Sequence, residues 1–148
     1  MADSVVTVRI TQRQGYQFDN EYGGTVPKLL TDEPPPLGQG AGPEPAQLLA
    51  SAVGNCLAAS LIFSLAKYRQ RADGLACQVD AEIGRNADKR LRVLGLRVRL
   101  TLPVAAAELQ HLDRALASFE DFCTVTGSIR AAIPVSVEVV DATGAVLK

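Results

Sequence analysis

The chain has 148 residues, of which 47% are hydrophobic, and its 15 basic side chains nearly balance 16 acidic ones. This length fits one domain, so we expect residues 1–148 to form a single domain. A net charge of −1 provides no positive field, which argues against sequence-independent binding to nucleic acid or to an anionic membrane surface. The only histidine, His111, excludes metal sites built from several histidines.

Three cysteines, Cys56, Cys77 and Cys123, are spaced without a CxxC pair or a zinc-like pattern. The sequence begins without the basic and apolar segments that are typical of a signal peptide. The longest apolar stretch, residues 48–66, includes four polar residues, so we interpret it as a buried helix rather than a membrane span. We therefore expect a cytoplasmic protein whose cysteines are thiols unless their chemistry is used.

The first part of the chain predicts two strands, over residues 5–10 and 16–18. Residues 31–45 are rich in proline and glycine and predict an irregular loop, which is either functional or a flexible flap because it is long for a connection in a compact domain. A helix is predicted over 45–69, since a proline suits its first turn. This helix is apolar on most sides, and we expect a second copy of the chain to cover it in an obligate homodimer.

The second part of the chain predicts two further strands, over 75–83 and 91–102. The latter alternates apolar residues with arginines, which indicates one solvated basic face, and Gly95 suggests a bulge. A helix over 105–122, a short helical turn and a final strand over 134–140 follow. This order of elements predicts an α+β domain.

Two of the cysteines are candidates for chemistry. Cys56 lies on an apolar stripe of the first helix, where a thiol either packs as a small hydrophobic side chain or carries a function. Cys123 lies where a helix ends and a segment rich in Thr, Gly and Ser begins. There it either packs beneath Phe122 or has a thiolate stabilised by backbone donors. Cys77 lies in a predicted strand and is interpreted as core or sheet surface.

Two segments of the chain resemble the OsmC/Ohr family, and specifically a less characterised branch of it. Residues 42–56 read Gly-Pro-Glu-Pro-Ala-Gln-Leu-Leu-Ala-Ser-Ala-Val-Gly-Asn-Cys, and residues 123–130 read Cys-Thr-Val-Thr-Gly-Ser-Ile-Arg. The resemblance implies an intertwined homodimer with antiparallel sheets packed around central helices. It also implies a role in the response to oxidative stress, without a cofactor or a metal.

The resemblance implies a two-cysteine peroxidase mechanism. Cys56 would attack the O–O bond of an organic hydroperoxide and become a sulfenic acid, which Cys123 would resolve to a disulfide. A dithiol, of the lipoyl type in some family members, would reduce that disulfide. We expect Cys56 and Cys123 to lie within reach of a disulfide, and Cys77 to lie away from both.

The sequence departs from the family pattern in one respect. The position of the family glutamate, ten residues before the first cysteine, is Ala46, and Glu44 is the nearest carboxylate. Arg13, in Arg13-Gln14-Gly15, resembles the arginine that activates the first thiol in the Ohr branch; alternatively it is an ordinary exposed strand residue. Without the glutamate we expect Arg13 to be mobile and peroxide reduction to be slower, and Ala46→Glu to raise the rate.

Two other readings stay open. The missing glutamate favours a non-catalytic OsmC-like dimer that binds a small ligand or senses redox state. Thiol-dependent transfer or hydrolysis through Cys56 lacks a base nearby in the sequence, because His111 is expected in the middle of the second predicted helix.

Overall fold

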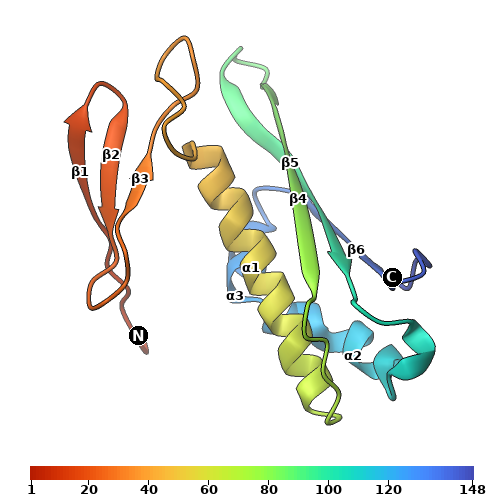
Figure 1. Cartoon of the computed structure of the whole chain (residues 1–148). Coiled ribbons are helices and arrows are strands. Elements are labelled where there is room, and N and C mark those ends of the chain that lie inside the picture. The colour runs from red at the N-terminus through yellow and green to blue at the C-terminus, as the bar shows by residue number, and fades with distance from the viewer. The chain divides into compact units, whose positions relative to one another are not determined.

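The computed structural model describes residues 1–148, which form two compact units, residues 1–48 and 49–148 (Figure 1). The first unit holds three antiparallel strands, β1 (Arg9–Gln14), β2 (Gln17–Glu21) and β3 (Leu29–Thr31), in that order. The predicted hairpin is present but lies further along the chain. Strand β3 was not predicted, because three residues are too few to show a period-two pattern.

The proline- and glycine-rich loop after β3 is organised by one carboxylate. Asp32 is buried, its Oδ1 accepts from the backbone N–H of Glu33 at 2.9 Å, and its Oδ2 accepts from those of Gln39 and Ala41 at 3.1 Å. Burial alone would raise the pKa of Asp32, but these bonds and one from Gln17 outweigh it and lower the pKa. The loop therefore lacks regular structure, as predicted, but its backbone is held in place by the buried carboxylate of Asp32.

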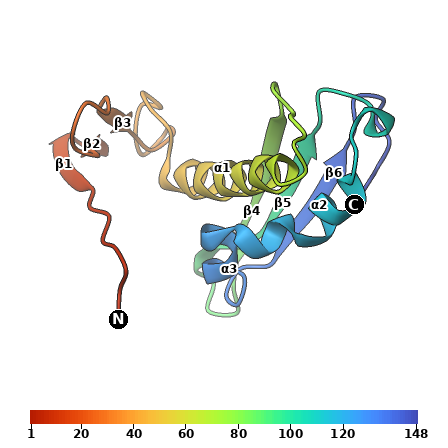
Figure 2. The same ribbon diagram turned by 90° about the horizontal axis from the view of Figure 1, so that it is seen from below.

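The second unit packs helices on one face of a sheet (Figure 2). Helix α1 (Pro45–Ala66), which begins in the first unit, is followed by β4 (Ala76–Arg85) and β5 (Leu91–Thr101). Helices α2 (Leu112–Ser118) and α3 (Thr124–Ile129) lead into β6 (Val135–Val140). Strand β5 is central, antiparallel to β4 and parallel to β6. This arrangement confirms the predicted α+β class.

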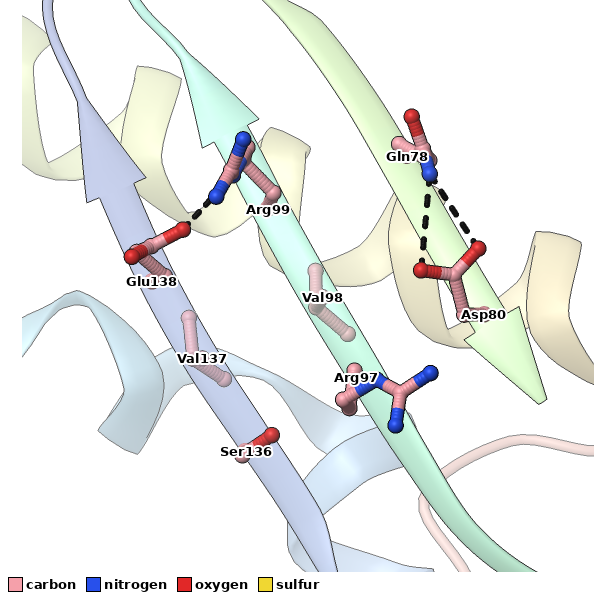
Figure 3. Close-up of a pocket in the computed structure, with 8 residues that line it drawn as sticks. All are labelled: Gln78, Asp80, Arg97, Val98, Arg99, Ser136, Val137 and Glu138. Carbon is pink, nitrogen blue, oxygen red and sulfur yellow. Dashed lines mark hydrogen bonds and ion pairs between the residues drawn. The ribbon is translucent and has the colours of Figure 1, made fainter. Parts of the chain in front are cut away.

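The predicted bulge in β5 is present one residue away from its expected place. Glu82 pairs with Gly95 and Ile83 with Val93, so Leu94 stands opposite no residue. The outer face of this sheet carries the expected arginines, with Arg99 paired to Glu138 (Figure 3). Arg97 is likewise paired with Glu82.

The prediction of one continuous helix over 105–122 is wrong. The structure divides it into the 3-10 turns η1 (Ala106–Glu108) and η2 (Phe119–Phe122) on either side of α2. His111 is not in the middle of a helix: it precedes α2 in a left-handed conformation, φ 56°, and its ring lies 5.3 Å from that of Tyr68. The Gln110 N–H donates to the Gln70 side chain at 3.0 Å. These contacts with a distant segment interrupt the helical pattern.

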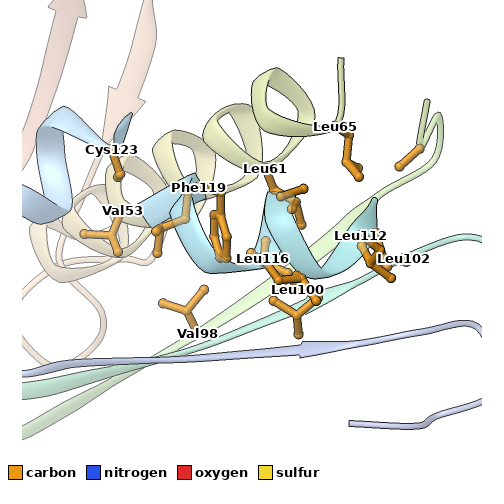
Figure 4. Packing of buried hydrophobic residues seen from close by; sticks show 14 of the residues in the cluster. Val53, Leu61, Leu65, Val98, Leu100, Leu102, Leu112, Leu116, Phe119 and Cys123 are labelled. Carbon is orange, nitrogen blue, oxygen red and sulfur yellow. The ribbon is translucent and has the colours of Figure 1, made fainter. Parts of the chain in front are cut away.

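The core of the second unit lies between the helices and the sheet (Figure 4). Helix α1 contributes buried side chains four residues apart: Val53, Leu57, Leu61 and Leu65. Strand β5, helix α2 and turn η2 supply the side chains that pack against them: Leu96, Val98, Leu100, Leu112, Ala115, Leu116 and Phe119. Ile62 and Phe63 lie exposed on another side of α1. By length and hydropathy α1 is long enough to cross a membrane, with 44% of its most apolar window buried inside the structure. Core helices meet the same criterion, so this is weak support for a membrane span.

Gly54 allows α1 to approach β4 closely. A Cβ at this position would lie 2.7 Å from Val79 Cγ2 and 3.2 Å from Cys77 Sγ. We expect Gly54→Ala to lower the free energy of unfolding by about 1–2 kcal/mol, because overpacking outweighs the better helix propensity of alanine. Urea denaturation measures this. Gly127→Ala in α3 is the control, since nothing lies within 4 Å of a Cβ there; a loss of stability at both positions would contradict the packing explanation.

The hydrogen bonds to Asp141 are expected to make the stability of the fold depend on pH. Hydrogen bonds from Thr143, first of all from its hydroxyl at 2.6 Å, and from the N–H groups of Ala106 and Ala145 lower the pKa of this buried carboxyl to about 2. A folded-state pKa below the unfolded value near 3.9 stabilises the fold above about pH 4, and this contribution is lost as the pH falls towards 2. In urea titrations, the gap between wild type and Asp141→Asn should be full at pH 5–7 and shrink below pH 4. A constant gap down to pH 2 would refute this assignment.

Candidate thiol site

Cys56 lines an open, mainly apolar pocket of about 390 Å³. The half-buried cysteine shares α1 with Ala59, Ser60 and Phe63, and Phe122 of η2 also lines the pocket. The two phenyl rings meet edge to face, with centroids 5.3 Å apart. The Lys67 ammonium lies 3.7 Å from the Phe122 centroid and 4.9 Å from that of Phe63. The sequence alone does not single out Phe63, Lys67 or Phe122 as site residues, although Phe63 and Lys67 recur with Cys56 and Ser60 at helical spacing.

Cys123 lies at the junction between η2 and α3. Its side chain is 2% exposed, with Sγ 3.1 Å from the Thr126 hydroxyl and accepting from the Thr126 N–H at 3.4 Å. Burial raises the pKa of Cys123, the hydrogen bonds with Thr126 oppose it, and interaction with the Cys56 thiol adds to the rise. The Cys56 thiol, 67 residues away in the sequence, thus lies close enough to raise the pKa of Cys123, which is a neutral thiol at pH 7.

Cys77 has different surroundings. It is exposed on β4, its Sγ faces Gly54 of α1, and it is not among the residues that line the pocket. Burial of its sulfur raises the pKa of Cys77, which keeps it protonated.

Arg13 has a carboxylate partner that its local sequence pattern does not reveal. It lies on β1 in the first unit, and its Nε is 2.9 Å from the carboxylate of Asp19 on β2. Its side chain is 54% exposed. Arg13 is therefore an exposed strand residue whose carboxylate partner lies in its own hairpin. Glu44 precedes α1 and its N–H donates to the Gln47 side chain at 3.0 Å.

The sequence pattern of the family described as OsmC-like protein matches residues 38–138, which include both thiols of the site. The chain belongs to the OsmC-like family. A search of curated proteins finds no match. No group of three or more His, Cys, Asp and Glu side chains is placed to hold a metal ion.

Solved structures show the same OsmC-like fold. An OsmC-like protein of Mycoplasma pneumoniae has a TM-score of 0.77 at 12% identity, over 95% of this chain and 99% of its own. An OsmC-like protein of Vibrio cholerae has a TM-score of 0.76 at 16% identity, over 93% and 99%. An organic hydroperoxide resistance protein of Bacillus subtilis has a TM-score of 0.69 at 17% identity, over 90% and 97%. At these identities the likeness establishes the fold alone.

Proposed function

We propose that this OsmC-like protein reduces organic hydroperoxides with Cys56 as the attacking thiol and Cys123 as the resolving thiol. The observation that carries the proposal is that Cys56 lines an apolar pocket and packs against the core cluster that contains the buried Cys123. The family, and the hydroperoxide resistance named for structural relatives, support a redox role for such a pair.

The chemistry balances with these two thiols. The Cys56 thiolate attacks the outer peroxide oxygen, the O–O bond breaks, and the alcohol leaves with a proton, so that Cys56 becomes a sulfenic acid. The Cys123 sulfur then attacks the Cys56 sulfur, water leaves, and a disulfide forms. An external dithiol supplies two electrons and two protons to restore both thiols.

The surroundings of the two cysteines support this order of reaction. Cys56 faces the pocket, where the Phe63 and Phe122 rings offer apolar surface to an alkyl or aryl tail. Cys123 is buried, and burial raises its pKa, so it is a poor nucleophile towards solvent peroxide. It becomes useful once Cys56 carries a sulfenic acid.

Peptide mapping after mild peroxide treatment tests the proposal. We expect a crosslink between Cys56 and Cys123, for which the Cα atoms must come within about 4.4–6.8 Å. A crosslink that contains Cys77, or irreversible oxidation of Cys56 without a crosslink, would contradict the assignment of Cys123 as the resolving thiol.

We keep Arg13 as the proposed activator of the Cys56 thiolate. An oriented guanidinium favours the charged form of a thiol, and Asp19 orients this one. Arg13→Ala should lower the rate of peroxide reduction, and Asp19→Asn should lower it less. Because Arg13 already has a carboxylate partner, any gain from Ala46→Glu should be small. A full rate in Arg13→Ala would discard the arginine and leave the two thiols.

We also propose that the protein is a homodimer in the cytoplasm and that each chain functions as one domain. The exposed Ile62 and Phe63 leave apolar surface on α1 that a second copy of the chain would cover. Sedimentation at micromolar concentration tests this, and a stable monomer would refute the dimer.

A redox sensor is the second candidate, because it needs the same pair of neighbouring thiols, Cys56 and Cys123. A sensor is oxidised once and then read by a partner, whereas a peroxidase consumes peroxide for as long as dithiol is present. Continuous consumption of cumene hydroperoxide with excess dithiol favours the peroxidase, and a single stoichiometric oxidation favours the sensor.

A further inference from the structure

One carboxylate joins the segments on both sides of Cys123. Glu120 lies in η2, three residues before the cysteine, and its Oε1 accepts from Arg130 Nη2 at 2.7 Å. Arg130 directly follows α3, the helix that begins after Cys123. The pair Glu120–Arg130 therefore joins the two ends of the segment 120–130, which contains Cys123 at the junction of η2 and α3.

Lys148 ties this loop to the core. Its ammonium lies 2.6 Å from Glu120 Oε2, donates to the carbonyl of Leu116 at 2.9 Å and sits 5.0 Å from the Phe119 ring centroid. The backbone carbonyl of Lys148 accepts from the N–H of Val139 in β6 at 3.0 Å. Glu120 is thereby held from two sides, by Arg130 and by a lysine whose own backbone is attached to the sheet.

Backbone bonds transmit this restraint to the thiol. The Cys123 N–H donates to the Glu120 carbonyl at 3.1 Å, and the Arg130 N–H donates to the Thr126 carbonyl at 3.0 Å. Thr126 in turn contacts Cys123 Sγ. Glu120 is thus bonded directly to the backbone of Cys123, and Arg130 is bonded to Thr126, which contacts the Cys123 sulfur.

Glu120 differs from the exposed ion pairs of the outer sheet face. Its side chain is 18% exposed, against 37% for Glu138. Burial raises the pKa of Glu120, but the hydrogen bonds from Lys148 and Arg130 outweigh it and lower the pKa, so the carboxylate is charged at neutral pH. A shielded and doubly bonded carboxylate restrains its partners far more than an exposed pair does.

We propose that Glu120 is a positioning residue for the resolving thiol: bridged to Arg130 and Lys148, it holds Cys123 buried and against Cys56. Its role in turnover rests on the proposed function. The geometric effect on the two thiols does not, because it concerns how readily they form a disulfide under any oxidant.

The test compares Glu120→Gln with Glu138→Gln, which removes a carboxylate from the exposed Arg99 pair, both in a Cys77→Ser background. Diamide removes two electrons and two protons from two thiols without any peroxide. We expect Glu120→Gln to slow formation of the Cys56–Cys123 disulfide about tenfold and Glu138→Gln to leave it unchanged.

Two further measurements separate positioning from general loss of stability. A tenfold lower effective concentration of the thiols should make the reduction potential of the disulfide about 30 mV less negative in Glu120→Gln, measured in dithiothreitol redox buffers. With Cys123 as the only cysteine, its alkylation by iodoacetamide should speed up about tenfold. Arg130→Gln and Lys148→Met, each of which removes one partner, should give smaller changes in the same directions and carry the test if Glu120→Gln does not fold.

The outcomes are distinct from those for the proposed function. Equal disulfide rates and potentials in wild type and Glu120→Gln, or equal changes in Glu120→Gln and Glu138→Gln, would overturn the positioning role. Wild type that forms the disulfide with diamide but consumes no hydroperoxide would refute the peroxidase alone.

Discussion

Replacing Cys56 by serine is expected to lower the rate of cumene hydroperoxide reduction by more than about a thousandfold. A serine hydroxyl is not ionised at neutral pH and is a far weaker nucleophile towards an O–O bond than a thiolate. The measurement is steady-state consumption of peroxide with excess dithiol. Equal rates for wild type and Cys56→Ser would end the peroxidase proposal.

The other two cysteines provide matched controls for this variant. Cys77→Ser should keep the wild-type rate, because Cys77 lies on β4 and is not among the residues that line the pocket. Cys123→Ser should still react once with peroxide, but its sulfenic acid would have no resolving thiol, so excess peroxide would oxidise it irreversibly. Mass spectrometry of Cys56 distinguishes a sulfinic acid from a disulfide. Inactivation of Cys77→Ser to the extent of Cys56→Ser would contradict the assignment of the site.

Truncating Phe119 to alanine should cost about 3–5 kcal/mol of the free energy of unfolding. The ring is fully buried among residues of α1, α2 and the sheet (Figure 4). A loss of this size is a large fraction of the roughly 5–15 kcal/mol by which a domain is stable. Urea denaturation measures the change, and loss of the folded state at room temperature would be its most severe form.

Phe122→Ala is the matched control, three residues along the same turn. Phe122 is 43% exposed, and its truncation removes the edge-to-face contact with Phe63 and the contact with the Lys67 ammonium. Such contacts contribute about 1 kcal/mol each at partly exposed sites, so the loss should be clearly smaller than at Phe119. Similar losses for the two variants would contradict the description of Phe119 as a fully buried core residue and of Phe122 as a partly exposed one.

The sequence by itself determined the class of the fold and the candidate thiols. The alternation of apolar residues and arginines over 91–102 predicts a strand with one solvated face, and β5 has that form. The apolar run after Pro45 predicts the long helix α1. Cys56 and Cys123 stand out because each lies in a segment that resembles the OsmC/Ohr pattern. Local periodicity is enough for such inferences, because it reports which face of an element is buried.

Only the tertiary structure decided the partners of the functional side chains. Periodicity does not reveal that Asp19 pairs with Arg13, that Gln70 and Tyr68 meet the segment around His111, or that Phe122 joins Phe63 at the pocket. Nothing in the local sequence around Glu120 reveals that Lys148 and Arg130 converge on its carboxylate. Each of these contacts joins residues from different elements, and the energy that selects them comes from burial and hydrogen bonds formed once those elements pack.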